Sequence, residues 1–281
     1  MLSTKQKIRL ARTAARLVTG MRRSFGAGEV AEVRRNGLNW RLELGEGIDF
    51  AIYLLGRFER DTQRQYERLL RPGDVALDIG ANIGAHTLPI SRLVGKTGCV
   101  HAFEPTAFAF AKLQANIACN ADLAERIKVR QILLRDGVGD TPPAALAASW
   151  PLGIRLGGHS VHGGHDMTTA GATVETLDSY AVREEIERID FIKLDVDGNE
   201  CQVLRGGQST LRRFRPPIIL ELAPYVFSSG QNSFETFINL LRDTGYRLMR
   251  SPGGAELPHD AAALTRYIAD GASINAWAMQ A

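Results

Sequence analysis

The chain has 281 residues, 44% of them hydrophobic and 23% charged, and a net charge of +3. This composition predicts a globular protein with one large domain, and the lack of an apolar run of about 20 residues argues against a membrane span. Three widely separated cysteines fit neither a metal-binding spacing nor a disulfide framework, so we expect a reducing, cytoplasmic setting.

The basic charge is concentrated in residues 1–28, which hold seven Lys or Arg and no Asp or Glu. In helical register, basic side chains such as Arg9 and Arg16 share one side, and Leu10, Leu17 and Met21 share another. We expect a basic amphipathic helix that docks on the domain or on a partner subunit. The alternative is peripheral contact with an anionic membrane or a lipid-linked substrate. No basic stripe follows this segment, which argues against nucleic acid as a partner.

Residues 29–70 predict a small cap before the main domain, which we place at residues 71–281. Short alternating runs on either side of Asn36-Gly37 predict a β-hairpin, because this pair favours the tight turns that join antiparallel strands. Residues 57–70 are charged and predict a helix that ends before Pro72.

From residue 71 the sequence alternates between apolar strands and amphipathic helices. Strands are expected near residues 75–79, 98–103, 127–132, 190–195, 217–222 and 246–249. Helices are expected near residues 84–94, 106–119, 199–213 and 233–243. This alternation predicts an α/β fold, with a mostly parallel sheet that is covered by helices on both faces.

A glycine-containing turn follows the first of these strands. The strand ends at Asp78, and Gly80 and Gly84 would let the backbone pass close to a ligand because neither carries a Cβ. The glycine spacing is that of neither a dinucleotide enzyme nor a P-loop, which disfavours a nicotinamide oxidoreductase. A carboxylate at the strand end suits a cationic, hydroxyl-rich ligand such as S-adenosylmethionine.

The second strand also ends in a carboxylate, Glu104, which Pro105 follows at the start of the next helix. A carboxylate at this distance after Asp78 suits a pair of ribose hydroxyls. Phe103 could contact an adenine ring, and Asp136 could accept its amino group. The expected cofactor-binding residues are therefore Asp78, Gly80, Ala81, Asn82, Gly84, Phe103, Glu104, Pro105 and Asp136.

Residues 135–172 are rich in glycine and hard to assign to helix or strand. A long segment of this kind, placed after the third strand, predicts a flap at the carboxyl edge of the sheet that selects the substrate. It contains a regular series of His159, His162 and His165. Glycines between these histidines offer no rigid frame for zinc, so we expect a polar loop instead of a metal site.

Two later blocks place more carboxylates at strand ends. Residues 190–200 contain Asp195, Asp197 and Glu200, and the strand at residues 217–222 contains Glu221. Together with residues 78–84, 103–105 and 176–178, these blocks resemble the FkbM-type S-adenosylmethionine-dependent methyltransferases. The resemblance covers roughly residues 50–250. Asp197 stands where many relatives have Glu, and the match is poor around Asp136.

This resemblance implies a class I methyltransferase fold and O-methylation of a hydroxyl on a sugar, glycolipid or secondary metabolite. The general base or acceptor anchor would come from Asp195, Glu200, Glu221 or His165, with Asp195 preferred. Asp197 and Glu200 could instead form a turn and cap the next helix. Two strand-end carboxylates could also hold a divalent metal, which we do not favour. A non-catalytic adenosyl-binding scaffold is the competing class of function.

Overall fold

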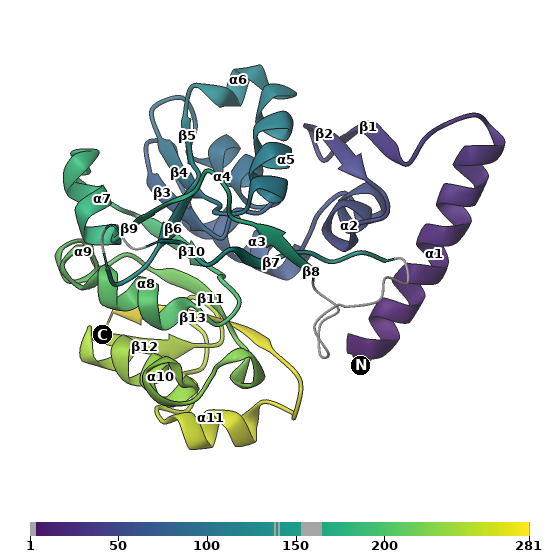
Figure 1. The fold of residues 1–281 in the computed structure, drawn as a ribbon. Coiled ribbons are helices and arrows are strands. Elements are labelled where there is room, and N and C mark those ends of the chain that lie inside the picture. Colours follow the sequence, from purple (N-terminus) through teal and green to yellow (C-terminus); the bar gives the residue numbers. More distant parts are fainter. Residues whose placement is uncertain (1–3, 138, 140, 153–164, 281) are drawn as a thin grey trace.

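The computed structural model describes residues 4–137, 139, 141–152 and 165–280, which are arranged around one large sheet (Figure 1). Its seven strands have the order β12-β13-β11-β10-β3-β4-β5. Their bounds are β3 (Val75–Ile79), β4 (Cys99–Phe103), β5 (Ile127–Arg130), β10 (Phe191–Leu194), β11 (Ile218–Leu222), β12 (Tyr246–Met249) and β13 (Ile274–Gln280). The strands from β11 to β5 are parallel, whereas β13 is antiparallel to both neighbours. The predicted mostly parallel sheet is confirmed.

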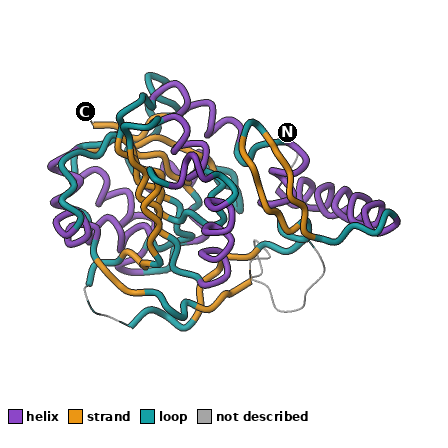
Figure 2. The backbone as a smooth tube through the Cα atoms, turned by 90° about the horizontal axis from the view of Figure 1, so that it is seen from above, coloured by secondary structure: helices purple, strands orange, loops and turns teal. Residues whose placement is uncertain are grey.

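Helices cover both faces of this sheet, which Figure 2 shows from above. On the first face lie α3 (Arg60–Leu69), α4 (Thr87–Leu93), α5 (Ala107–Ala118) and α6 (Ala121–Ala124). On the second lie α7 (Leu177–Arg183), α8 (Glu200–Gly206), α9 (Gln208–Phe214), α10 (Phe234–Asp243) and α11 (Ala261–Tyr267). Both groups bury apolar side chains, because successive strand residues such as Ala76 and Leu77 point to opposite faces.

Several elements differ from the sequence-based expectation. The strand expected at residues 127–132 divides into β5 and β6 (Ile132–Leu134), and β6 leaves the main sheet to pair with β9 (Thr173–Glu175). The helix expected at residues 199–213 is broken into α8 and α9 at Gly207. Strand β13 was not predicted, because nothing local indicates that a C-terminal segment inserts between β11 and β12.

The cap contains the predicted hairpin, formed by β1 (Val30–Arg35) and β2 (Leu38–Glu43). Asn36 and Gly37 both adopt positive φ angles, of 49° and 79°, as a tight two-residue hairpin turn requires. Helix α2 (Gly47–Leu55) follows. Buried Trp40 and Leu42 of β2 share an apolar cluster with Leu113 of α5, so the cap packs directly on the main domain.

Helix α1 (Thr4–Ser24) lies at the periphery beside this hairpin in both views (Figures 1 and 2). Its buried contacts come from small residues around Ala15, and the larger Leu10, Leu17 and Met21 are 58–68% exposed. These larger side chains are therefore not the ones that pack on the described domain, and docking on a partner subunit stays a prediction. No described helix is long and apolar enough to span a bilayer. Membrane contact through this segment stays a prediction.

The segment expected to be a flap contains two strands, β7 (Ala145–Ser149) and β8 (His165–Thr168), which pair antiparallel. The expectation of an irregular segment is thus wrong for this part. His159 and His162 lie outside the described residues. Between β11 and α10 the chain forms two short 3-10 helices, Pro224–Val226 and Gly230–Asn232.

Candidate active site

A cavity of about 440 Å³ lies at the carboxyl edge of β4, β3, β10 and β11. This volume is within the range of small-molecule sites, and the carboxyl edge is where open α/β sheets bind ligands. The strand ends contribute Glu104, Gly80, Asp195 and Glu221 to its lining. All four of these residues are among the site residues selected in the sequence analysis.

Glu104 forms one end of the cavity and is held firmly by its neighbours. Its Oε1 accepts hydrogen bonds from the backbone N–H and the hydroxyl of Thr106, at 2.9 and 2.6 Å. Its Oε2 accepts a third, at 3.0 Å, from the backbone N–H of Asn82. Burial raises the pKa of Glu104, and these hydrogen bonds oppose the rise because they stabilise the ionised carboxylate.

The two glycines of the turn are required by packing within the protein. A Cβ on Gly80 would lie 1.8 Å from the backbone oxygen of Asp195, and one on Gly84 would lie 2.9 Å from Leu113 Cδ1. Both glycines also have positive φ angles, which L residues with side chains rarely adopt. The structure thus gives a reason for these glycines other than the predicted close approach to a ligand. Gly80, Ala81 and Asn82 line the cavity, and Gly84 packs on α5.

Asp78 lies beneath this turn, outside the cavity lining. Its side chain is fully buried, and its Oδ2 accepts a 2.6 Å hydrogen bond from the hydroxyl of Thr87. Its Oδ1 has no hydrogen-bond partner among the described residues. A direct contact between Asp78 and a cofactor, as the sequence analysis expects, would require access that this buried position does not provide.

Carboxylates crowd the opposite end of the cavity, at β10 and β11. Asp195, Asp197 and Glu221 line it together with buried Lys193. Lys193 Nζ lies 3.0 Å from Asp195 Oδ2, and Ser273 donates its hydroxyl to Glu221. Although burial alone would lower the pKa of Lys193, the charges of Asp195 and other nearby carboxylates raise it, so this lysine stays cationic.

The acidic groups at this end influence one another. Burial, followed by the negative charge of Asp195, raises the pKa of Glu221 to about 7. The same two causes raise the pKa of Asp197 well above its usual range. Glu221 therefore titrates close to neutral pH, which suits a group that accepts a proton during turnover.

Glu59 and His86 line the cavity beside this acidic end, and the sequence analysis did not select either as a site residue. Glu59 Oε2 lies 3.5 Å from His86 Nε2, and the other ring nitrogen of His86 lies 3.2 Å from the hydroxyl of Tyr66. Burial alone would raise the pKa of Glu59, but the His86 ring and the charge of Lys193 lower it to about 2. Glu59 lies in a charged segment before the glycine turn, where no motif marks it.

Three other predicted residues lie away from the cavity lining. Glu200 is buried, with Oε1 accepting a hydrogen bond from the backbone of Val196 and Oε2 unpartnered among the described residues. Asp136 forms an ion pair with Arg205 at 2.7 Å, although it was expected near adenine. His165 belongs to β8, where it pairs with Ser149.

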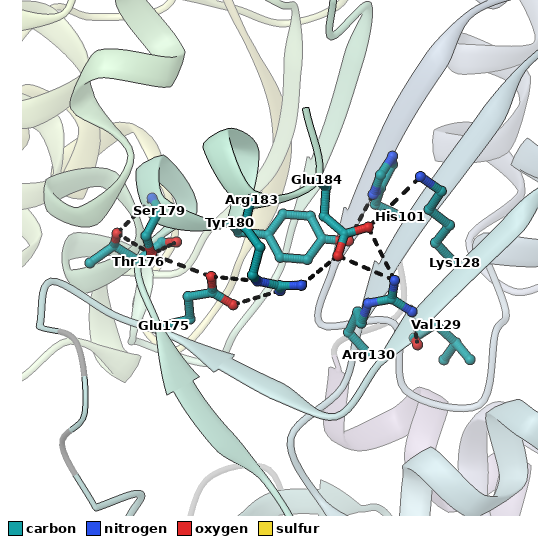
Figure 3. A network of polar contacts seen from close by, with 10 residues as sticks. All are labelled: His101, Lys128, Val129, Arg130, Glu175, Thr176, Ser179, Tyr180, Arg183 and Glu184. Carbon is teal, nitrogen blue, oxygen red and sulfur yellow. Dashed lines mark hydrogen bonds and ion pairs between the residues drawn. The ribbon is translucent and has the colours of Figure 1, made fainter. Parts of the chain in front are cut away.

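Phe103 and Pro105 line the cavity, as expected. The ring of Phe103 also packs against Tyr180, which belongs to a polar network outside the cavity lining. Phe103 packs edge-on against Tyr180, with ring centroids 4.7 Å apart. The hydroxyl of Tyr180 lies 2.8 Å from Nδ1 of buried His101 (Figure 3). Next to this pair, Glu184 binds Arg130 and Arg183 and so links β5 to α7. The cavity wall near β4 is therefore joined to α7 and β5 by a connected set of contacts.

The flap segment reaches the cavity and is tied to the cap. Leu146, Ala147 and Trp150 line the cavity. Gly47 donates its backbone N–H to the Trp150 carbonyl at 2.9 Å, and Trp150 donates its own to a carboxylate oxygen of Glu46 at 3.0 Å. The flap at Trp150 is thus tied to the loop that leads into α2.

Among the described residues, no three His, Cys, Asp or Glu side chains are grouped so that they could hold a metal ion. The alternative of a divalent metal between Asp195 and Glu221 stays a prediction.

Comparisons with known proteins give the protein its family. The methyltransferase FkbM domain matches residues 78–248, which is more than half of the chain. The chain is 28% identical over 159 residues to the hexuronic acid methyltransferase AglP of Haloferax volcanii, covering 56% of this chain and 59% of that protein. It is 32% identical over 158 residues to the 31-O-demethyl-FK506 methyltransferase FkbM of Streptomyces tacrolimicus, covering 49% and 60%. The chain thus spans less than two thirds of the length of these two relatives.

The 2-O-methyltransferase NoeI of Sinorhizobium fredii is 29% identical over 191 residues, covering 64% of this chain and 76% of that protein. Among solved structures, the methyltransferase FkbM of Methylobacillus flagellatus superposes with a TM-score of 0.45 at 15% identity, over 77% of this chain and 50% of that one. The sheet described above is that of the class I fold implied by the resemblance. The chain belongs to the FkbM family of methyltransferases.

Proposed function

We propose that the protein is an S-adenosylmethionine-dependent O-methyltransferase that acts on a hydroxyl of a sugar, glycolipid or other small molecule. The proposal rests mainly on one observation: a single cavity has a carboxylate at each end, and the two carboxylates differ in their surroundings. Glu104 is fixed and buried at the β4 end, and Glu221 titrates near neutral pH at the β11 end. The names of the three relatives, which describe methylation of a hexuronic acid, of 31-O-demethyl-FK506 and at a 2-O position, support the same chemistry.

The residues present fit the donor by their chemistry. Glu104 would accept a ribose hydroxyl at the acceptor site that its three hydrogen bonds leave open, and the apolar walls beside it, including Phe103 and Leu134, would take the adenine ring. A lining with more acidic than basic side chains is suitable for S-adenosylmethionine, which carries a positive sulfonium and a positive ammonium group. When bound, S-adenosylmethionine supplies a methyl group that is already activated for transfer.

The chain must then position the acceptor and remove its hydroxyl proton. We assign the proton to the Glu221 carboxylate, whose pKa of about 7 lets it accept a proton at neutral pH. Asp195 was the preferred base in the sequence analysis, but its ion pair with Lys193 makes it better suited to hold the acceptor in line. The flap residue Trp150 would contact the acceptor or exclude water from the site.

The test has two steps. Isothermal titration calorimetry with S-adenosylmethionine, S-adenosylhomocysteine and NAD(P) should show binding of the first two alone. Methyl transfer from labelled donor to a panel of saccharides should then label at least one neutral or acidic sugar at a hydroxyl. Binding of NAD(P) in place of the adenosyl ligands would overturn the proposal.

A further inference from the structure

Glu59 stands at the N-cap position of helix α3, but its side chain does not cap the helix. It is the residue that precedes helix α3, where a short polar side chain such as Asp or Ser commonly caps the first free backbone N–H groups. Its side chain makes no capping hydrogen bond, and its backbone has a φ of 45° and a ψ of 63°. This left-handed conformation is strained for a residue with a side chain, and strain of this kind is concentrated at ligand sites. The local geometry places the carboxylate in the cavity wall.

The surroundings keep this carboxylate charged without saturating it. Its Oε2 contacts His86 Nε2 at 3.5 Å and Asn275 Nδ2 at 3.4 Å, both longer than a good hydrogen bond, and the side chain of Thr62 is a further donor that lowers its pKa. His86 is itself buried, and its Nε2 has no hydrogen-bond partner within normal distance. The neighbouring ring and Lys193 hold the pKa of Glu59 near 2, so it is ionised at every physiological pH.

The strand-end carboxylates of the cavity, unlike Glu59, already have a close partner. Glu104 accepts three hydrogen bonds, Asp195 is paired with Lys193, and Glu221 is bonded to Ser273. The contacts of Glu59 to His86 and Asn275 are longer, at 3.5 and 3.4 Å, and leave its carboxylate able to accept a further donor. Glu59 is also a poor proton acceptor, because a group with so low a pKa does not take a proton at neutral pH. Its chemistry suits a ligand that carries a fixed positive charge.

Glu59 and Glu104 contact different parts of the chain around the glycine turn. Glu104 bonds to Asn82 within the turn, whereas Glu59 contacts His86 just after its end. On the proposed function, the donor's ribose lies at Glu104, and its amino-acid chain extends from the other side of the ribose. We infer that Glu59 binds the ammonium group of the donor's amino-acid end and thereby orients the donor in the cavity.

The inference rests on the proposed function and can be tested separately from it by comparing two ligands. S-adenosylhomocysteine carries the ammonium group, whereas 5′-methylthioadenosine has the same adenosine and lacks the amino-acid end. In calorimetric titrations, Glu59→Gln should weaken S-adenosylhomocysteine binding about 10- to 100-fold and change 5′-methylthioadenosine binding less than about twofold. Glu59→Asp, which keeps the charge on a shorter side chain, should fall between the wild type and Glu59→Gln.

Two control variants complete the test. Glu67→Gln removes a carboxylate from the same helix, where it pairs with Arg57 outside the cavity lining, and should leave both affinities unchanged. Glu104→Gln should weaken both ligands together. Equal losses for both ligands in Glu59→Gln, or no loss for S-adenosylhomocysteine, would overturn the inference. If the wild-type protein binds neither ligand, it is the proposed function that fails.

Discussion

The two ends of the cavity use the same functional group in opposite surroundings. At the β4 end, Glu104 accepts three hydrogen bonds from Asn82 and Thr106. At the β10–β11 end, Asp197 and Glu221 lie close to other acids, and their pKa values are raised by burial and by the charge of Asp195. A carboxylate with many donors is a fixed binding group, whereas one crowded by like charges can exchange a proton near neutral pH.

The largest effect is expected from a change at Gly80 of the glycine turn, which packs against the backbone of Asp195 at the end of β10. Gly80→Ala would place a methyl group within 1.8 Å of the Asp195 backbone oxygen, at a φ of 85° that disfavours alanine. Because neither strand end can move without disturbing the sheet, we expect a loss of at least about 3 kcal/mol in unfolding free energy. Urea denaturation measures this loss. Gly20→Ala in α1, where no atom lies within 4 Å of the added carbon, should be neutral or slightly stabilising and serves as the control.

At the acidic end, Glu221→Gln should lower kcat by about 10²- to 10⁴-fold, because the amide cannot accept the acceptor's proton. In the wild type, the rate should rise with pH through about 7 and then level off, since the base works only when it is deprotonated. The variant should lose this pH dependence. A variant with wild-type kcat and an unchanged pH profile would assign the base elsewhere.

A substitution at Glu200 tests whether this acid is only buried or also takes part in catalysis. Burial raises its pKa from 4.5 to about 7, so the folded protein loses stability as the pH rises through this window and Glu200 must ionise. Glu200→Gln should therefore be more stable than the wild type by up to about 3 kcal/mol at pH 8, with little difference near pH 4. Thermal unfolding at the two pH values measures this. Turnover should stay close to that of the wild type. A large loss of turnover would show that Glu200 takes part in catalysis, as the sequence analysis allowed.

The smallest effect is expected for His165→Asn. His165 lies in β8 and does not belong to the cavity lining, so kcat and KM should stay within about twofold of the wild type. A steady-state assay over several pH values is sufficient. A large fall in kcat would show that the flap carries the base, contrary to the assignment of Glu221.

The sequence predicted the parts of the site that follow directly from strand ends. Glu104, Asp195 and Glu221 each end an apolar strand, and parallel strands bring their carboxyl ends to one edge of the sheet. Asp78 shares that pattern but lies behind the turn, because its side chain points under α4 toward Thr87. Strand-end position therefore identifies the edge without fixing which side chains reach the cavity.

The residues that were missed come from segments distant in sequence. Glu59 precedes the first strand of the sheet, and Ser273 precedes the antiparallel strand β13, whose insertion beside β11 has no local signal. Lys193 was read as part of a strand, where a buried lysine is unexpected until its carboxylate partners are known. These contacts depend on tertiary packing, which neither periodicity nor spacing reports.

The most direct test of the account is a calorimetric titration of S-adenosylhomocysteine into the wild type, Glu104→Gln and Glu221→Gln. The account predicts that Glu104→Gln raises Kd about 10- to 100-fold, because the ribose loses a charged acceptor, whereas Glu221→Gln leaves Kd within about threefold. Undiminished affinity in Glu104→Gln, or no binding to the wild type, would contradict the assignment of the β4 end to the adenosyl donor.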